Sequence, residues 1–549
     1  MEKLYTPEGE LLQGQPWQVY PRPQLKRKSF YNLNGLWDFT VDEKNFEINV
    51  PFPPESLLSG LDMEIPPGTL MQYSKNFTLP EGFVKDRVLL HFGAVDQECE
   101  VYLNGEFIGD HKGGYEHFTF EITDFLKDEN VLEVKAWDNL GDNILPYGKQ
   151  TLKRGGMWYT PVSGIWQTVW IESVPEHYVK SLKIDVGTDF ARIWADGVYD
   201  GKISVTTPQG ILVSKLVNGV AEVDILEPCL WSPEHPYLYY FVLESGKDRV
   251  ESYFALRTLE IKKIDGVPRL CLNGEPYFFN GLLDQGYYSD GIFTPADPVC
   301  FESEIKIAKS LGFNMLRKHI KVEPEQFYYD CDRFGMVVFQ DMVNNGKYSF
   351  IRDTALPTIG LKRLCDKKMH TNPESRKAFC EAMESTVKDL YNHPCICYWT
   401  IFNEGWGQFS STEMYHKLKA LDSSRFIDSA SGWFSGGESD VESLHVYFKK
   451  FKMPKRGKRP VVLSEFGGYS YKPEGHVFNK ENTYGYRFFK EIEEFKAALK
   501  KLYNEEIYPA IPKGLCAAVY TQLSDVEDET NGLISYDRKV VKIEDDFLK

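Results

Sequence analysis

Two glutamates that close apolar runs are the residues of this chain best placed to do chemistry. Glu404 ends the run CYWTIFNEG, and Glu465 ends the run VVLSEFGG 61 residues later. Two carboxyl groups at one site can cleave an acetal bond, because one protonates the departing oxygen while the other attacks the carbon or activates water. This is the chemistry of glycoside hydrolysis, and the separation of the two groups decides whether the sugar's configuration is retained or inverted.

The elements that must position these glutamates follow one another in the last 291 residues, 259–549. Eight apolar, β-branched runs alternate there with helical patterns: YFFNGLL, FNMLRKHI, MVVFQDM, CICYWTIFNE, RFIDSAS, SLHVYF, PVVLSEFG and AAVYTQLSD. That alternation predicts a (β/α)8 TIM barrel. The functional face of such a barrel is built from the C-terminal ends of its strands, so Glu404 in the fourth run and Glu465 in the seventh are expected to meet at the mouth.

The part of the chain before the barrel is predicted to be entirely β. Short runs of period-two patterning, such as VYLNGEFIGDH with its Asn-Gly turn, predict an N-terminal jelly-roll sandwich over residues 1–175. Four or more strands in residues 176–258 predict a smaller immunoglobulin-like sandwich. The sequence therefore predicts a multidomain protein in which two β-sandwiches precede a barrel over residues 259–549.

The composition restricts the classes of partner. A net charge of −17 disfavours sequence-independent binding to nucleic acid or to an anionic membrane, because both require a basic face. The N-terminal residues contain no apolar signal segment, and the ten cysteines include no C-x-x-C pair. We therefore predict a cytoplasmic protein with free thiols and no cofactor, and we leave homo-oligomerisation open.

Motifs along nearly the whole chain resemble glycoside hydrolase family 2, which contains β-galactosidases, β-glucuronidases and β-mannosidases. NE after the fourth strand and SEFG at the seventh resemble the acid/base and nucleophile motifs of that family. YPRPQLKRKSFYNLNGLWDF and TPVSGIWQTVWIE resemble parts of its sugar-binding-like N-terminal domain. The resemblance implies the same three-domain order and an exo-acting, retaining β-glycosidase.

The resemblance also implies roles for individual residues. Glu465 is expected to be the nucleophile and Glu404 the general acid/base, while Asn403 is expected to bind the sugar 2-hydroxyl. Tyr447 is expected to lean on the nucleophile, and Arg317 to keep it ionised, as a neighbouring cation would. The other predicted substrate contacts are His445, Asp284, Gln285, Lys318, His319, Lys321, Asp341, Trp406 and Gln522.

Two departures from the family pattern leave the sugar open. The first strand ends in Asp284 and Gln285 rather than in a His-Glu pair, and the last strand is not followed by the Asn-x-Lys clamp of ordinary β-glucuronidases. A cation cluster that includes Lys318 and Lys321 could bind a uronate carboxylate instead, or its lysines could be solvated or pair with Glu323 and Asp341.

The sequence therefore predicts hydrolysis of a terminal β-linked sugar in a carbohydrate or glycoconjugate, either a β-hexuronide (β-galacturonide or β-glucuronide) or a β-galactoside. An enzyme for other neutral β-glycosides is an alternative. A carbohydrate-binding protein that has lost catalysis is an alternative of another class, and the presence of both glutamates disfavours it. We predict no essential metal, because no compact set of ligands stands out in the sequence.

Overall fold

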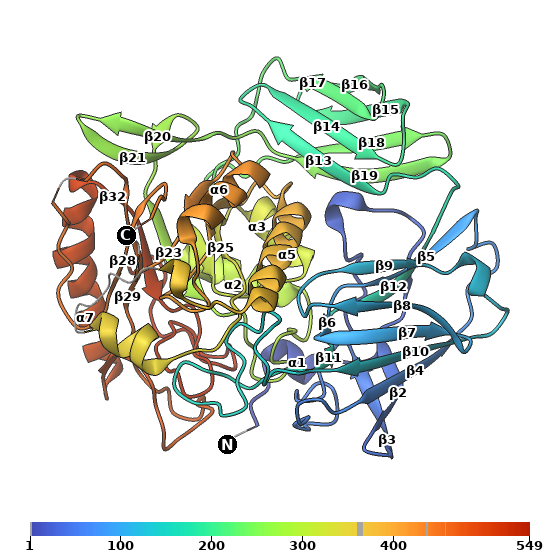
Figure 1. The fold of residues 1–549 in the computed structure, drawn as a ribbon. Coiled ribbons are helices and arrows are strands. Elements are labelled where there is room, and N and C mark those ends of the chain that lie inside the picture. Colours follow the sequence, from blue (N-terminus) through green and yellow to red (C-terminus); the bar gives the residue numbers. More distant parts are fainter. Residues whose placement is uncertain (1–2, 359–365, 435–436, 456, 549) are drawn as a thin grey trace.

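In the computed structural model, two β units are followed along the chain by an α/β unit (Figure 1). The structure describes residues 3–358, 366–434, 437–455 and 457–548. Among these residues, no helix combines the length and the apolar composition that crossing a membrane requires. The nine cysteines in the described part of the chain are all free thiols.

The first unit is a sandwich of two antiparallel sheets, preceded by the short helix α1 (Pro7–Leu11). One sheet has the order β1 (Tyr31–Asn32), β12 (Val169–Val174), β5 (Arg87–Phe92), β9 (Phe118–Glu121). The other has the order β3 (Lys44–Val50), β2 (Gly35–Val41), β4 (Met71–Phe77), β10 (Asn130–Trp137), β7 (Glu98–Leu103), β8 (Glu106–Lys112). Buried and exposed side chains alternate along β2 and β10, because only one face of each strand meets the core. A small ladder joins β6 (Val95–Asp96) to β11 (Gly164–Ile165).

The second unit is a smaller sandwich, as the strand spacing predicted. Its three-stranded sheet has the order β13 (Ser181–Val186), β14 (Phe190–Asp196), β17 (Val220–Asp224). Its four-stranded sheet has the order β16 (Gly210–Leu216), β15 (Gly201–Thr207), β18 (Tyr239–Ser245), β19 (Asp248–Phe254). The buried indole of Trp231, which precedes β18, donates to the carbonyl oxygen of Asp332 at 2.8 Å and so links this unit to the barrel.

The third unit is a nearly closed barrel of eight parallel strands. Their order is β27 (Phe426–Asp428), β26 (Ile396–Thr400), β25 (Val337–Asp341), β24 (Met315–Lys318), β23 (Phe279–Asp284), β32 (Leu515–Thr521), β29 (Val461–Gly467), β28 (Glu442–Val446). All eight correspond to the predicted apolar runs. Every residue of β23, β24, β25, β26, β29 and β32 is buried, because parallel strands carry helices on one face and the barrel interior on the other.

Helices lie outside the strands of the barrel (Figure 1). They are α2 (Val299–Ser310), α3 (Glu325–Phe334), the short α4 (Leu356–Thr358), α5 (Pro373–Leu390), α6 (Ser411–Leu421) and α7 (Ile492–Leu502). A three-stranded antiparallel sheet precedes the first barrel strand; its strands are β20 (Leu259–Ile264), β21 (Val267–Leu272) and β22 (Glu275–Pro276). A short ladder joins β30 (Tyr469–Ser470) to β31 (Arg487–Phe488). β12 ends at Val174 and β13 begins at Ser181, while β19 ends at Phe254 and β20 begins at Leu259; the domain boundaries after residues 175 and 258 stay predictions.

A long loop of the first domain, residues 138–163 between β10 and β11, lies against the barrel. The backbone N–H of Tyr147 donates to the carbonyl oxygen of Asn344 at 3.1 Å. Further along the loop, the ring of Trp158 lies 5.1 Å from that of Trp406, and the Tyr159 hydroxyl donates to the carboxylate of Glu529. Trp158 and Tyr159 of the first domain therefore contact residues of the barrel.

A buried ion cluster joins the two sandwiches. The carboxylate of Glu172, on β12, is fully buried and accepts from Arg22 Nη2 at 3.0 Å and from Arg27 Nη1 at 3.3 Å. Arg27 also donates to both carboxylate oxygens of Asp248, on β19 of the second sandwich. Burial alone would raise the pKa of Glu172, but Arg22, His91 and Arg27 hold it well below its ordinary value.

Replacing Glu172 with glutamine should destabilise the protein strongly. The change leaves the buried guanidinium groups of Arg22 and Arg27 without their shared anion, which typically costs about 3 to 5 kcal/mol in the free energy of unfolding. Thermal and urea unfolding followed by circular dichroism would measure the loss. The matched control is Glu222→Gln, which removes an exposed ion pair with Arg192 and should cost at most about 1 kcal/mol. Equal effects of the two changes would contradict a structural role for the cluster.

Candidate active site

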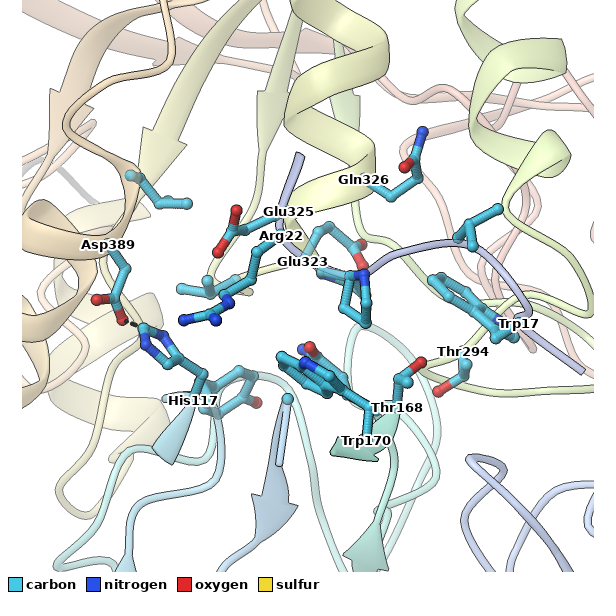
Figure 2. Close-up of a pocket in the computed structure, with 18 residues that line it drawn as sticks. Trp17, Arg22, His117, Thr168, Trp170, Thr294, Glu323, Glu325, Gln326 and Asp389 are labelled. Atoms are coloured by element: carbon cyan, nitrogen blue, oxygen red, sulfur yellow. Dashed lines mark ion pairs between the residues drawn. The ribbon is translucent and has the colours of Figure 1, made fainter. Parts of the chain in front are cut away.

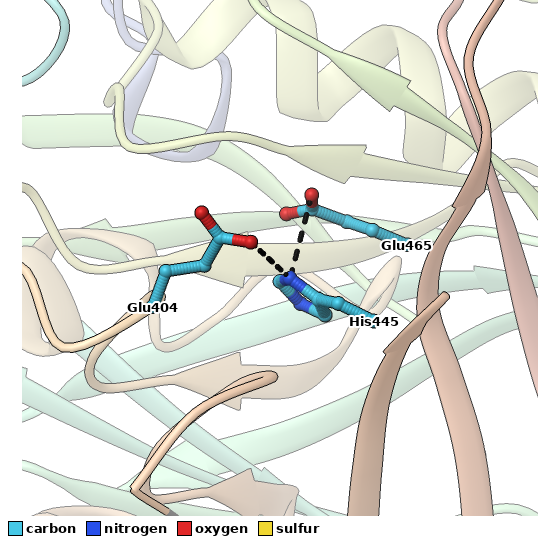
Figure 3. Close-up of side chains that lie close together, drawn as sticks. All are labelled: Glu404, His445 and Glu465. Atoms are coloured by element: carbon cyan, nitrogen blue, oxygen red, sulfur yellow. Dashed lines mark hydrogen bonds and ion pairs between the residues drawn. The ribbon is translucent and has the colours of Figure 1, made fainter. Parts of the chain in front are cut away.

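The two predicted catalytic glutamates meet at the mouth of the barrel (Figure 3). Glu465 lies within β29. Glu404 lies four residues beyond the last residue of β26, in a tight turn rather than on the strand itself. Its φ of 51° is in the left-handed region, and its backbone N–H donates to the carbonyl oxygen of Ser431 at 2.9 Å. This strained turn is what directs the Glu404 side chain back over the mouth.

His445, on β28, lies between the two carboxyl groups (Figure 3). Its Nδ1 is 2.7 Å from Oε1 of Glu404 and 3.5 Å from Oε2 of Glu465. One oxygen from each glutamate and a nitrogen of His445 all lie within 4.8 Å of one another. This short separation matches the close carboxyl pair of retaining glycosidases, since inverting enzymes hold the two groups about 6.5 to 9.5 Å apart. A metal ion could also fit such a spacing, and the absence of an essential metal stays a prediction.

Arg317, on β24, connects Glu465 to the rest of the barrel. Its Nη1 donates to Oε1 of Glu465 at 3.1 Å and to the carbonyl oxygen of Ser464 at 3.0 Å. Its Nε donates to Asp341 at 3.0 Å, and its Nη2 donates to Oδ1 of Asn403 at 2.9 Å. The side chain is buried, so these acceptors replace water around the guanidinium.

These contacts keep Glu465 ionised. Burial by itself would raise the pKa of its carboxyl group, but the neighbouring His445 and Arg317 outweigh that effect and lower the pKa to about 2. The hydroxyl of Tyr447 donates to the other oxygen of Glu465 and acts in the same direction. A fully ionised carboxylate with a fixed orientation is the state that a nucleophile needs.

Asn403 and His319 each keep one polar atom for a ligand. The amide oxygen of Asn403 is taken by Arg317, which leaves its NH2 group as a donor. Nδ1 of His319 lies 2.8 Å from Asp341, whose pKa is lowered by Arg317 against the effect of burial. Burial lowers the pKa of His319 to about 4, so the ring is neutral near pH 7. With Asp341 ionised, Nδ1 donates and Nε2 is left as an acceptor.

Lys318 and Lys321 belong to an internal ion network. Nζ of Lys318 is 2.6 Å from Asp284 and 2.8 Å from Glu323. Nζ of Lys321 contacts both oxygens of Glu323 and also donates to the carbonyl oxygens of Gly286 and Phe293. The sequence left open whether the two lysines bind a uronate, are solvated, or pair with Glu323 and Asp341. In the structure they pair with Glu323, and the other carboxylate is Asp284 rather than Asp341. These contacts give no support to a role for the two lysines or for Asp284 in substrate binding.

The remaining predicted residues fall into an amide pair and an aromatic group. Nε2 of Gln285 donates to Oε1 of Gln522 at 2.8 Å, and both side chains are buried. Trp406 packs against Trp158 and against Tyr348, with ring centroids 5.1 and 5.9 Å apart. The indole N–H of Trp406 makes no hydrogen bond within the described residues, so it remains available to a ligand.

The structure also places at the mouth residues that the sequence analysis did not select. Lys149 arrives from the first domain, Glu529 lies beyond β32, and Tyr486 stacks on Tyr447 with ring centroids 3.7 Å apart. All three lie in irregular segments without hydrophobic periodicity. No local sequence pattern therefore marks these three residues as part of the site.

A separate pocket lies where the first sandwich meets the barrel (Figure 2). Arg22, His117 and Trp170 line it from the sandwich side, and Glu325 and Asp389 line it from the barrel side. His117 Nδ1 is 3.2 Å from Asp389. Neither Glu404 nor Glu465 borders this pocket, and the His117–Asp389 pair joins the two domains across it.

Three family models match consecutive parts of the chain. The model of the glycosyl hydrolases family 2 TIM barrel domain matches residues 268–506. The model of the glycosyl hydrolase 2 galactose-binding domain-like region matches residues 67–144, and that of glycosyl hydrolases family 2 matches residues 195–257. The order of the matches is the order of the three units in the structure.

The curated relatives are named as β-galactosidases or as β-glucuronidases. A β-galactosidase of Thermoanaerobacter pseudethanolicus is 26% identical over 402 residues, which are 67% of this chain and 49% of the relative. The chain thus spans about half the length of that protein. A β-glucuronidase of Felis catus is 22% identical over 502 residues, which are 78% of this chain and 72% of the relative.

Solved structures share the fold at low identity. A β-D-glucuronidase of Dictyoglomus thermophilum superposes with a TM-score of 0.74 at 18% identity and covers 95% of this chain and 97% of its own. A β-galacturonidase of Eisenbergiella tayi bound to galacturonate superposes with a TM-score of 0.69 at 19% identity, covering 94% and 96%. Since the three family models follow the three observed domains in order, the chain belongs to glycoside hydrolase family 2.

Proposed function

We propose that the protein is an exo-acting, retaining β-glycosidase in which Glu465 is the nucleophile and Glu404 the general acid/base. The observation that carries this proposal is the close pair of carboxyl groups with unequal partners. Glu465 receives hydrogen bonds from Arg317 and Tyr447 and is held ionised, whereas the ring of His445 is the side chain that contacts Glu404. Unequal surroundings of this kind separate an acid from a nucleophile.

The reaction would run in two displacements. In the first, a Glu465 oxygen forms a bond to the anomeric carbon while the bond to the leaving oxygen breaks, and protonated Glu404 gives that oxygen its proton. In the second, the Glu404 carboxylate takes a proton from water, whose oxygen attacks the same carbon and releases Glu465. The free NH2 of Asn403 is placed to donate to the sugar 2-hydroxyl, a contact that strengthens in the transition state.

The substrate would be a terminal β-linked sugar, either a β-hexuronide or a neutral β-galactoside. The loop of residues 138–163 packs across one side of the mouth and supports binding of a chain end rather than of a chain interior. The relatives named above act on both kinds of sugar according to their names, and their low identity leaves the choice to this chain's own residues.

Removal of the nucleophile should be partly reversed by a small anion. Glu465→Ala is expected to lose nearly all turnover of a nitrophenyl β-glycoside, and azide should restore some of it by entering the space of the missing carboxylate. Because azide attacks from that side, the product should be the α-glycosyl azide, which NMR distinguishes from the β anomer. The matched control is Glu413→Ala on the exposed face of α6, with unchanged activity. Formation of the β-azide would exclude Glu465 as the nucleophile.

Loss of the acid should depend on the leaving group. Glu404→Gln cannot donate a proton, so substrates with poor leaving groups should slow by about 100-fold or more. Dinitrophenyl glycosides, which depart without protonation, should be affected far less in their first displacement. Steady-state and burst kinetics on a series of aryl glycosides would measure this difference. An equal loss across the series would argue against Glu404 as the acid.

The charge of Arg317 should be visible in the pH profile. Arg317→Met removes a cation that lowers the pKa of Glu465, so the acidic limb of kcat/KM should move upward by about one pH unit or more. The limb is set by ionisation of the nucleophile, which must lose its proton before it attacks. Arg249→Met, at an exposed ion pair, is the control. A lower rate with an unmoved acidic limb would show that Arg317 acts on geometry alone.

A further inference from the structure

Lys149 is brought to the barrel mouth by the loop of the first domain. The residue before it, Gly148, has a φ of 68°, and a Cβ there would lie 2.8 Å from the carbonyl oxygen of Ile320. The backbone of the loop therefore touches the barrel next to His319. On the other side, the carbonyl oxygen of Lys149 accepts from the N–H of Tyr159 at 3.1 Å. The backbone of Lys149 is thus fixed by neighbours before any ligand binds.

The ammonium group of Lys149 lies among aromatic rings and carboxylates without contacting an acceptor. The side chain is buried, and Nζ lies 5.1 Å from the centroid of the Trp406 ring and 5.7 Å from that of Tyr159. Within the described residues it makes no hydrogen bond and no ion pair. Burial lowers the pKa of Lys149. The negative charges of Glu529, Glu465 and Glu404 oppose this effect from beyond ion-pair distance.

The neighbouring charged groups do not need Lys149 as a partner. The Glu529 carboxylate accepts from the hydroxyl of Tyr159 and from Nδ2 of Asn531. The Glu465 carboxylate is satisfied by Arg317 and Tyr447. A buried cation without a partner is costly, and such groups concentrate where a ligand supplies the missing contact.

We infer that Lys149 determines specificity by binding the carboxylate of a β-hexuronide in the active site. This inference rests on the proposed function, because it concerns the sugar that the two catalytic glutamates would cleave. A uronate brought into the site meets the negative charge of Glu465 and needs a cation that is not already neutralised. The ammonium of Lys149 has its three donors unused, whereas the donors of Lys318 and Lys321 are engaged by protein acceptors.

The test compares charged and neutral sugars in wild type, Lys149→Met and Lys149→Arg. Nitrophenyl β-galacturonide, β-glucuronide, β-galactoside and β-glucoside are the substrates. Wild type should prefer a uronide, and Lys149→Met should lower kcat/KM for that uronide by at least about 30-fold, the loss typical of removing one partner of a buried charge pair. The neutral substrates should lose less than about 5-fold, and Lys149→Arg should recover part of the uronide activity. Lys153→Met, an exposed lysine in the same loop, should match wild type.

Two kinetic results would overturn the inference while leaving the proposed function standing. One is wild-type preference for a neutral sugar, and the other is an equal loss on charged and neutral sugars in Lys149→Met. Absence of turnover on all four substrates would instead contradict the proposed function. Calorimetric titration of galacturonate, glucuronate and galactose would then still test Lys149, because the inference requires a uronate to bind more tightly than galactose to wild type and not to Lys149→Met.

Discussion

The buried ion pair between Arg317 and Glu465 is the interaction on which the site depends. A guanidinium inside a barrel is tolerated only if acceptors surround it, and here they come from β25, from β29 and from the turn after β26. The same contacts orient Glu465, the proposed nucleophile, and occupy the oxygen of Asn403, which leaves its NH2 group as a donor. Arg317 therefore lowers the pKa of Glu465 and fixes the direction of a neighbouring donor at once.

Residues of the first domain line the site at the barrel mouth. Its loop covers one side of the mouth with Trp158 and Tyr159, and it holds Lys149 over the ring of Trp406. Gly148 permits this approach, since any side chain there would meet the barrel backbone. An isolated barrel would keep Glu404 and Glu465 and would lose Lys149, Trp158 and Tyr159 at the mouth.

The sequence predicted the three-domain fold and all eight barrel strands, because period-two patterning and buried parallel strands leave strong local signals. Glu404 and Glu465 could be selected because polar residues that follow apolar barrel strands converge at one face. The sequence could not show in the same way which side chains between Arg317 and Lys321 face the site. Neighbouring side chains in a strand point to opposite faces, so Arg317 reaches Glu465 while Lys318 reaches Asp284. Lys149 had no local signal, since its loop is irregular and its partners lie in another domain.

The contrast among the three lysines shows why charge alone is a poor guide to binding. Three buried lysines lie near the mouth: Lys318, Lys321 and Lys149. Their charge alone does not distinguish them. Hydrogen-bond partners separate them, because Glu323 and Asp284 neutralise the first two and leave nothing for a ligand to gain. Binding energy comes from contacts that the free protein lacks, so Lys149, which has no hydrogen-bond or ion-pair partner among the residues that the structure describes, is the lysine whose position a ligand can exploit. A buried lysine can therefore bind an anionic ligand only where the folded protein does not already supply its counter-ion.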